Sequence, residues 1–413
     1  MLLIRSLINL DIFDVNWDVS SKEINQVELT GSGKFGVFEG AARFFLYILK
    51  SIFYFKFNIS TFKSRVLRVS GTSNQSKALS RLSSLGELIQ IGNISDNRNN
   101  NSFEAVPYLI SIVFFPLYLW KVISEKDKFK RKMLLCRMDR FIFSYGLFFF
   151  FHLVMNKQNT KLIIISNDHS VWQRTLILVA RSKGIAVAYV QHANVSSLFP
   201  RLSVDYAFLD GQHACNAYAK EAYCKVIRVG CLRFENYKSF KTEPETTARK
   251  GILLCFNKVD SDKMIVDTLN NVNRIISSDQ VIGVRFHPAD NRTQLFKNEQ
   301  INISFVDETQ KDLDDVLSRY EYCFAGVSSI FLEASLANLY CFSVRDIFFD
   351  YFNFEVDGIV KVFPCWQSVE LSSVKNTRLN ATLLYNSCED YLKNIELPSD
   401  RINCVLKGYN SAS

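Results

Sequence analysis

The stretch KLIIISNDHSVWQRTLILVARSKGIAVAYVQH, Lys161–His192, decides the fold of this chain. It contains two apolar runs, KLIIIS and IAVAYVQH, joined by a loop and a helical segment that ends at Gly184. Strands that are apolar at every position are typical of a parallel sheet covered on both faces. A connection of this length suits a crossover helix between parallel strands. The stretch therefore predicts a βαβ unit.

The same alternation of strand and helix continues on both sides of this unit. Before it, RVLRVSG and GELIQIGN predict two strands around a helix at 73–85. After it, VDYAFLD and KVIRVG predict two strands around a helix at 213–224. A polar stretch at 235–250, ENYKSFKTEPETTARK, is typical of a linker. Beyond the linker the strand–helix alternation starts again.

A chain of 413 residues is too long for a single hydrophobic core. The pattern predicts an α/β fold of two Rossmann-like parallel-sheet domains, at 1–240 and 241–413. Two such domains place a cleft between the carboxyl ends of both sheets, which is where ligands bind in this architecture.

Positive charge is concentrated in the first part of the chain. Residues 1–160 carry 21 basic and 12 acidic residues, whereas residues 161–413 carry 28 and 29. The basic part also contains the most apolar segments, and this combination favours an anionic membrane surface as partner. No nucleic-acid-binding motif is present, so nucleic acid is not expected as a partner. The ten cysteines have no regular spacing, which favours a reducing cytoplasm.

Three apolar segments resemble membrane spans: Arg43–Phe57, Val106–Ile123 and Phe141–Met155. A helical span needs about 20 apolar residues. Lysines interrupt the first segment, Pro116 interrupts the second, and the third is too short. We expect buried or interfacial helices here.

The stretch VRFHPADNR, 284–292, contains the first candidate site. Arg285 and His287 flank Phe286 at the carboxyl end of a predicted strand, so both side chains are expected on the face opposite to Phe286. Pro288 ends the strand and stiffens its exit. An arginine and a histidine at this place can neutralise a phosphate or diphosphate. A structural histidine at a strand end is the alternative.

The stretch FAGVSSIFLEA, 324–334, contains the second candidate site. It predicts a strand, a turn at Gly326, and a helix that opens at Ser328 and Ser329, where unpaired N–H groups favour an anion. Glu333, one turn on, can accept from a ribose hydroxyl or support the cap. An ordinary serine cap is the alternative.

Together, Arg285-x-His287-Pro288 and Gly326-x-Ser328-Ser329-x-x-x-Glu333 resemble the donor-binding half of bacterial GT-B glycosyltransferases of capsule and lipopolysaccharide synthesis. The resemblance is to the families that use CMP-sugars: sialyltransferases, polysialyltransferases and Kdo transferases. It covers residues 160–350. It implies that His287, Ser328 and Ser329 hold the nucleotide phosphate of the donor.

A general base in these families comes from the first domain, in an acidic tripeptide ending in glycine. This chain departs from that pattern, since Leu209-Asp210-Gly211 lacks the paired acid. Two other places qualify. Asp168 follows the strand KLIIIS, and His192 follows IAVAYV in a Gln-His pair. A carboxylate or a neutral histidine can deprotonate an acceptor hydroxyl. Asp168 as a helix cap is the alternative.

No metal site is expected. Asp260-Ser261-Asp262 resembles a metal-binding DxD, but it begins a predicted helix, where an acid has a capping role. Asp312–Asp315 also begins a helix. Cysteine and histidine show no zinc spacing. The resemblance implies metal-independent chemistry without a cofactor, in which the nucleotide-sugar is a substrate.

The expected function is that of an inverting glycosyltransferase at the cytoplasmic face of a bacterial membrane. It would move a sialic acid, Kdo or related nonulosonate from a CMP donor to a surface polysaccharide or lipid-linked acceptor. The alternatives are a CDP-glycerol-type polyol-phosphate transferase, a UDP-sugar 2-epimerase, and a non-catalytic partner in polysaccharide assembly.

Overall fold

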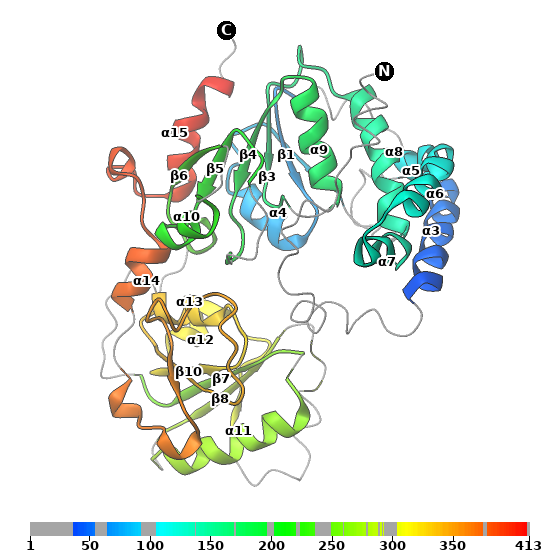
Figure 1. Ribbon diagram of the computed structural model, residues 1–413. Coiled ribbons are helices and arrows are strands. Elements are labelled where there is room, and N and C mark those ends of the chain that lie inside the picture. Colours follow the sequence, from blue (N-terminus) through cyan, green and yellow to red (C-terminus); the bar gives the residue numbers. More distant parts are fainter. Residues whose placement is uncertain are drawn as a thin grey trace.

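The predicted fold class is confirmed. The computed structural model describes residues 36–53, 64–91, 105–136, 138–168, 171–195, 202–219, 224–235, 249–258, 260–277, 280–287, 290, 292, 304–374 and 378–410. These residues form two sheets of six parallel strands, each covered by helices, in the GT-B arrangement (Figure 1).

The first sheet has the strand order β2-β1-β3-β4-β5-β6. Its strands are β1 Val66–Ser70, β2 Glu87–Gln90, β3 Leu162–Ile165, β4 Ala186–Val190, β5 Tyr206–Leu209 and β6 Lys225–Arg228. Its crossover helices are α4 Ser73–Ser80, α9 Val171–Ser182 and α10 Gln212–Ala219. The predicted βαβ unit is β3-α9-β4, with Leu162 opposite Ala186 and Ile165 opposite Tyr189.

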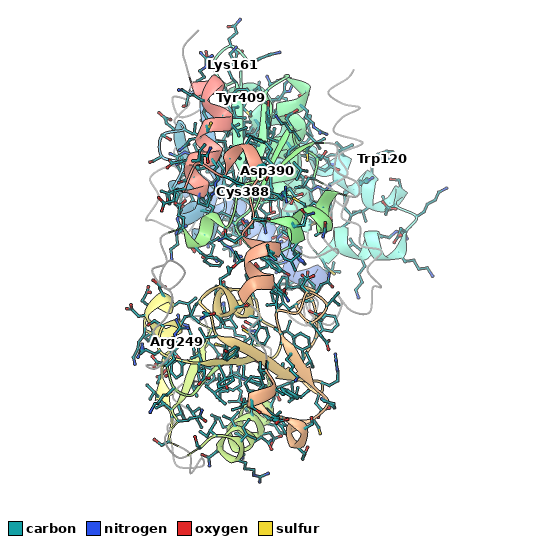
Figure 2. All side chains as sticks on the ribbon, turned by 90° about the vertical axis from the view of Figure 1, so that its left-hand side faces the viewer. Trp120, Lys161, Arg249, Cys388, Asp390 and Tyr409 are labelled. Carbon is teal, nitrogen blue, oxygen red and sulfur yellow. The ribbon has the colours of Figure 1, made fainter. Side chains whose placement is uncertain are left out.

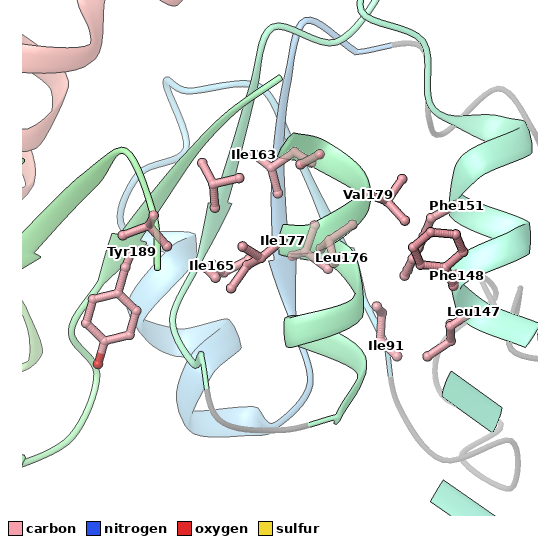
Figure 3. Close-up of a cluster of buried hydrophobic side chains, with 14 of the residues drawn as sticks. Ile91, Leu147, Phe148, Phe151, Ile163, Ile165, Leu176, Ile177, Val179 and Tyr189 are labelled. Carbon is pink, nitrogen blue, oxygen red and sulfur yellow. The ribbon is translucent and has the colours of Figure 1, made fainter. Parts of the chain in front are cut away.

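Both faces of β3 are buried, which is why every position of this strand is apolar. Ile163 and Ile165 belong to the core on the side of α9. Figure 3 shows Val179 of α9 pointing away from the sheet, toward Phe148 and Phe151 of α8, Met138–Val154. The first domain is therefore layered as sheet, α9 and α8 on this side.

The second sheet has the strand order β12-β11-β10-β7-β8-β9. Its strands are β7 Ile252–Phe256, β8 Ile282–Phe286, β9 Val306–Asp307, β10 Tyr322–Ala325, β11 Tyr340–Val344 and β12 Lys361–Phe363. Its helices are α11 Asp262–Ile275, α12 Leu313–Leu317 and α13 Ile330–Leu336. Counted in chain order within the domain, this is the order 3-2-1-4-5-6, whose direction of winding reverses between β7 and β10. The sequence did not predict β12.

A group of helices lies beside the first sheet. It consists of α3 Gly36–Phe53, α5 Ala105–Ser111, the 3₁₀ turn η2 Ile112–Phe114, α6 Phe115–Ser124, α7 Lys128–Cys136 and α8. A Cβ at Gly146 of α8 would lie 2.0 Å from the carbonyl oxygen of Pro107, so glycine permits the close packing of α8 on α5.

Two expectations for this group were wrong. The basic connector EKDKFKRK is largely helical, since α7 begins at Lys128. Pro116 does not end the second apolar segment, because it lies in the first turn of α6, where a missing N–H costs no hydrogen bond. In the described part of the chain, Ala105–Ser124 is long and apolar enough to cross a membrane, judged by length and composition alone.

The carboxyl end of the chain returns to the first domain. After α14, Arg378–Tyr385, the chain runs to α15, Pro398–Asn410. Leu392, Ile402 and Leu406 are buried in one core with β1 and α4. Figure 2 shows Tyr409 near Lys161, at the far end of the first domain from the second domain. Sequence reasoning did not anticipate this return.

The predicted linker lies mostly outside the described residues, which resume at Arg249 after Glu235. The domain boundary at residue 240 therefore stays a prediction.

Candidate functional site

The loops at the carboxyl edges of the two sheets contact each other. Asn194, after β4, donates from Nδ2 to the carbonyl oxygen of Ser329, after β10, at 3.5 Å. Arg233, after β6, lies 3.7 Å from Glu333 of α13. Ligands of open parallel sheets bind outside the carboxyl ends of the strands. The contacts therefore place the seam between the domains at the edges expected to bind a substrate.

The loops after β7 and β10 are tied together where the second sheet reverses its winding. Asn257, after β7, donates from Nδ2 to the carbonyl oxygen of Val327 at 2.5 Å. Its backbone N–H donates to Asp260 Oδ2 at 2.6 Å. Arg292 donates from Nη2 to the carbonyl oxygen of Asn257 at 2.8 Å. These bonds fix the backbone that leads to Ser328.

His287 emerges beside this pair of loops. Its backbone N–H donates to the carbonyl oxygen of Phe256, at the end of β7, at 2.9 Å. Phe286 is buried in the core and His287 is exposed, as the sequence predicted for alternate positions of the strand. Pro288 lies outside the described residues. A short chain of hydrogen bonds thus links His287, through the β7 end and Asn257, to the loop of the two serines.

Ser328 and Ser329 are half-buried just before α13. Ser328 Oγ accepts from the N–H of Ile330 at 3.3 Å, whereas Ser329 occupies the N-cap position without a side-chain cap. A Cβ at Gly326 would lie 3.1 Å from the carbonyl oxygen of Ile347, so glycine permits the close approach of this loop. The helix begins at Ile330, slightly later than predicted.

Arg285 is directed elsewhere. Its Nη1 donates to the carbonyl oxygens of Glu308 and Lys311 at 2.7 and 2.9 Å. These carbonyls belong to the segment between β9 and α12, so the guanidinium supports this loop. A role for Arg285 at a donor phosphate stays a prediction.

A buried cluster of Asp210, Arg233 and Glu333 bridges the domains. Arg233 donates from Nη2 to Asn194 Oδ1 at 2.6 Å and lies 3.7 Å from Asp210 Oδ2. Among the described residues, Asp210 Oδ2 and Glu333 Oε2 accept no hydrogen bond. A single guanidinium therefore lies between two buried carboxylates, one from each domain.

Burial shifts both carboxylates toward the protonated form. Burial raises the pKa of Asp210 to about 7, against the opposing effect of Arg233. Burial also raises the pKa of Glu333, again opposed by Arg233. A carboxyl group that gains and loses its proton near neutral pH is suited to acid–base chemistry.

The two predicted base candidates occupy different surroundings. Asp168 is buried, with an exposed fraction of 3 %. Burial is the largest cause of the raised pKa of Tyr189, and the charge of Asp168 is the second largest. It lies at the end of β3, as predicted, among buried aromatic side chains. His192 is half-buried and belongs to the loop after β4 whose Asn194 reaches Ser329. The structure thus places His192 in the loop that meets the second domain.

The acids of the DxD-like segment have structural partners. Ser261 Oγ accepts from the N–H of Met264 and caps α11, while Asp262 pairs with Arg292 at 2.9 Å. Asp312 caps α12 by accepting from the N–H of Asp314. The described residues contain no group of three or more potential metal ligands.

A third contact between the domains involves His213 of α10. Its Nδ1 lies 2.7 Å from Asp357 Oδ2, and its ring stacks on Tyr385. Tyr385 donates from its hydroxyl to the same carboxylate at 2.8 Å. This buried histidine has partners on both ring nitrogens, since Nε2 faces the carbonyl oxygen of Val195 at 3.2 Å. It therefore holds the domains together.

Sequence reasoning missed Asn194 and Arg233 and set Asp210 aside. A signal was available in the sequence, because each of the three residues follows one of the predicted strands β4, β5 and β6 within about five residues. Polar residues after successive parallel strands meet at one edge. The sequence around Asp210 lacks a neighbouring acid, whereas the fold brings Glu333 of the other domain to the same guanidinium, that of Arg233.

The fold defines the class of the chain as a two-domain α/β protein whose two parallel sheets meet through the loops at their carboxyl edges. No family model and no curated protein matches the chain. Similar solved structures include an S. aureus MnaA–UDP co-structure, with 13% identity, 84% of this chain and 97% of that chain covered, and a TM-score of 0.49. The UDP-GlcNAc 2-epimerase from Methanocaldococcus jannaschii has 14% identity and a TM-score of 0.49, and the alignment covers 83% of this chain and 99% of the epimerase. The wall teichoic acid polymerase TagF has 10% identity and a TM-score of 0.45, and the alignment covers 91% of this chain and 98% of the polymerase. No conclusion on activity follows from likenesses at this level.

Proposed function

We propose that the chain is an inverting, metal-independent glycosyltransferase of bacterial surface polysaccharide synthesis. Its donor is a CMP-linked sialic acid, Kdo or related nonulosonate, and its acceptor is an oligosaccharide or a lipid-linked chain. The observation that carries the proposal is the link from His287, through the end of β7 and Asn257, to the loop of Ser328 and Ser329. That loop lies where the second sheet reverses its winding, and it contacts a polar loop of the first sheet.

In the proposed reaction an acceptor hydroxyl oxygen bonds to the anomeric carbon of the donor sugar. The bond from that carbon to the phosphate oxygen breaks, and CMP leaves. The exposed His287 imidazole and the hydroxyls of Ser328 and Ser329 stabilise the departing phosphate by hydrogen bonds that strengthen as charge develops. The proton of the acceptor hydroxyl passes to a base of the first domain.

Three residues of the first domain are candidates for this base. Asp168 and His192 come from the sequence pattern, and Asp210 is added because its pKa of about 7 suits proton transfer near neutral pH. Replacement of the base by Asp168→Asn, His192→Asn or Asp210→Asn should lower the transfer rate by about 10²- to 10⁴-fold and leave nucleotide binding intact. The pH–rate profile of the remaining activity identifies which of the three titrates.

A thermal-shift screen with CMP, CDP, UDP and GDP tests the donor site. A nucleotide that binds the folded protein raises its melting temperature, by mass action. We expect the largest shift with CMP, and its loss in His287→Ala. Lys263→Ala, on the exposed side of α11, is the control variant. His213→Ala is not used as a control, because it would disrupt the contact between the domains.

The outcome separates the proposal from its alternatives. A preference for CDP would favour a polyol-phosphate transferase, and a preference for UDP would favour a sugar epimerase. CMP binding without transfer to any acceptor tested would favour a non-catalytic partner. An unchanged CMP shift in His287→Ala would remove His287 from the donor site.

A further inference from the structure

Helix α3 carries large apolar side chains on its outer face. Phe38, Phe45, Leu49 and Ile52 recur at helical spacing, and Phe38 is 75% exposed. The opposite face packs inward, with Phe44 and Ser51 buried. Apolar side chains therefore cover the outer as well as the inner face of α3, although the helix also carries Glu39, Arg43 and Lys50. An exposed apolar helix face is typical of a surface that contacts lipid or another protein.

The helix of the second apolar segment repeats this arrangement. Val113, Trp120 and Ile123 project outward from η2 and α6, and Ile123 is 78% exposed. Tyr118 on the inner face is buried and donates from its hydroxyl to the carbonyl oxygen of Leu134 in α7, at 2.9 Å. Figure 2 shows Trp120 on the pale cyan helices that protrude from one side of the first domain.

Basic residues adjoin these apolar faces. Lys121 lies in the last turn of α6, and exposed Lys126, Lys128, Arg131 and Lys132 follow on the connection and on α7. Together the ranges 36–53 and 105–136 hold eight basic and three acidic residues. Exposed apolar rings bordered by lysines are complementary to the boundary between the headgroups and acyl chains of an anionic bilayer.

We propose that the outer faces of α3 and η2–α6 form a docking surface for an anionic lipid bilayer, together with five basic residues: Lys121, Lys126, Lys128, Arg131 and Lys132. This surface is called the helical docking face below. The apolar side chains enter the headgroup region while the lysines and arginine contact lipid phosphates. The proposal does not depend on the proposed transferase activity, since the surface is separate from the facing sheet edges.

Packing favours an interfacial position over a membrane span. Ala105, Pro107, Tyr108 and Ser111 of the apolar segment are buried within the domain, and α5 packs closely on Gly146. A span would have to leave these contacts, whereas a helix that lies in the plane of the interface keeps them. The first domain would then dock as a folded unit.

Vesicle co-sedimentation of the full chain tests the docking. The probes are vesicles of equal parts phosphatidylglycerol and phosphatidylcholine, and vesicles of phosphatidylcholine alone. We expect binding to the anionic vesicles, weakened by salt, and little binding to the neutral ones. Combined Phe45→Gln, Leu49→Gln and Trp120→Gln should reduce the partition coefficient by about tenfold or more, because buried apolar area is lost.

Two further variants keep the test decisive. Combined Lys126→Glu, Lys128→Glu and Lys132→Glu leaves the apolar face intact and should also reduce anionic binding about tenfold. Val356→Gln with Leu383→Gln removes apolar side chains elsewhere that are at least as exposed, and this variant should leave binding unchanged. Circular dichroism and melting temperature confirm that each variant folds.

Other results would overturn the docking face. Unchanged vesicle binding in both helical variants would do so, as would equal binding to neutral vesicles. A dimer in solution that becomes monomeric in the Phe45, Leu49 and Trp120 variant, without vesicle binding by the wild type, would assign the face to a second copy of the chain. Resistance of the wild type to extraction by alkaline carbonate would assign α5–α6 to a span.

Discussion

Asp210→Asn provides a direct test of the buried cluster between the domains. Asparagine keeps the shape of the side chain and its acceptor oxygen but removes the titration. Asp210 is 2 % exposed, and burial raises its pKa from 3.8 to about 7. Arg233 keeps a carboxyl neighbour in the variant, because Glu333 Oε1 lies 3.7 Å from its guanidinium.

The sign of the effect follows from the direction of the shift. An acid whose pKa is raised on folding binds its proton more tightly in the folded state, so it stabilises the fold at low pH. That contribution disappears as the pH rises through the folded-state pKa, which is about 7. At about 1.4 kcal/mol per pKa unit, the wild type should lose about 3 kcal/mol between pH 5 and pH 8 relative to the variant.

Urea unfolding of both proteins at several pH values between 5 and 8 measures this difference. Tryptophan fluorescence and circular dichroism should be recorded together, because a two-domain chain can unfold in more than one step. Groups that do not interact with Asp210 titrate in the same way in both proteins and cancel in the difference. Asp267→Asn, on the exposed side of α11, is the control for the loss of a carboxylate.

A difference that stays constant over this pH range would refute the burial argument. A difference of the opposite sign, in which the wild type gains stability over the variant as the pH rises, would show that the attraction to Arg233 outweighs burial. The folded protein would then be more stable with Asp210 ionised than with Asp210 protonated.

Two further predictions concern the fold. Leu406→Ala should lower the free energy of unfolding by about 2 to 5 kcal/mol and speed hydrogen exchange in β1 and α4, because Leu406 is buried in their shared core. The control is Leu383→Ala, at an exposed position. Unchanged, slow exchange in β1 of the Leu406 variant would contradict the assignment. Gly86→Ala should cost more than about 1 kcal/mol, because φ is +67° and a Cβ would lie 2.0 Å from the carbonyl oxygen of Val66. Gly408→Ala, where a Cβ meets nothing within 4 Å, should instead be neutral or stabilising by up to about 1 kcal/mol, and equal effects at both positions in urea unfolding would contradict the strain argument.

Much of the fold was predictable because local patterns report it directly. Strands such as LIII in β3 are apolar throughout since both faces of the sheet are covered, and the loop-and-helix lengths between them permit only crossover connections. The positions of Phe286 inside and His287 outside also followed from the two-residue repeat of a strand. The cap of α12 at Asp312 follows from the same kind of local pattern, whereas the cap of α11 is Ser261 and not one of the flanking acids.

The missed features depend on contacts between residues far apart in sequence. β12 is a three-residue strand, too short to show a pattern. Helix α7 resembles a charged connector because its first turns are basic, although Lys, Arg, Met and Leu all favour a helix. The return of Leu392, Ile402 and Leu406 to the first core has no local signal, since these side chains would serve equally in a second-domain core.

The amino-acid sequence by itself determined two parallel α/β domains and the polar residues that end their strands, because periodicity and chain breaks are local properties. Only the tertiary structure decided which of those polar residues meet. It directed Arg285 to a neighbouring loop, brought Glu333 to Arg233, and buried Asp210 deeply enough to raise its pKa to about 7. The physical reason is that the burial of a side chain and its charged partners depend on residues from both domains. Those residues come close together only when the chain has folded.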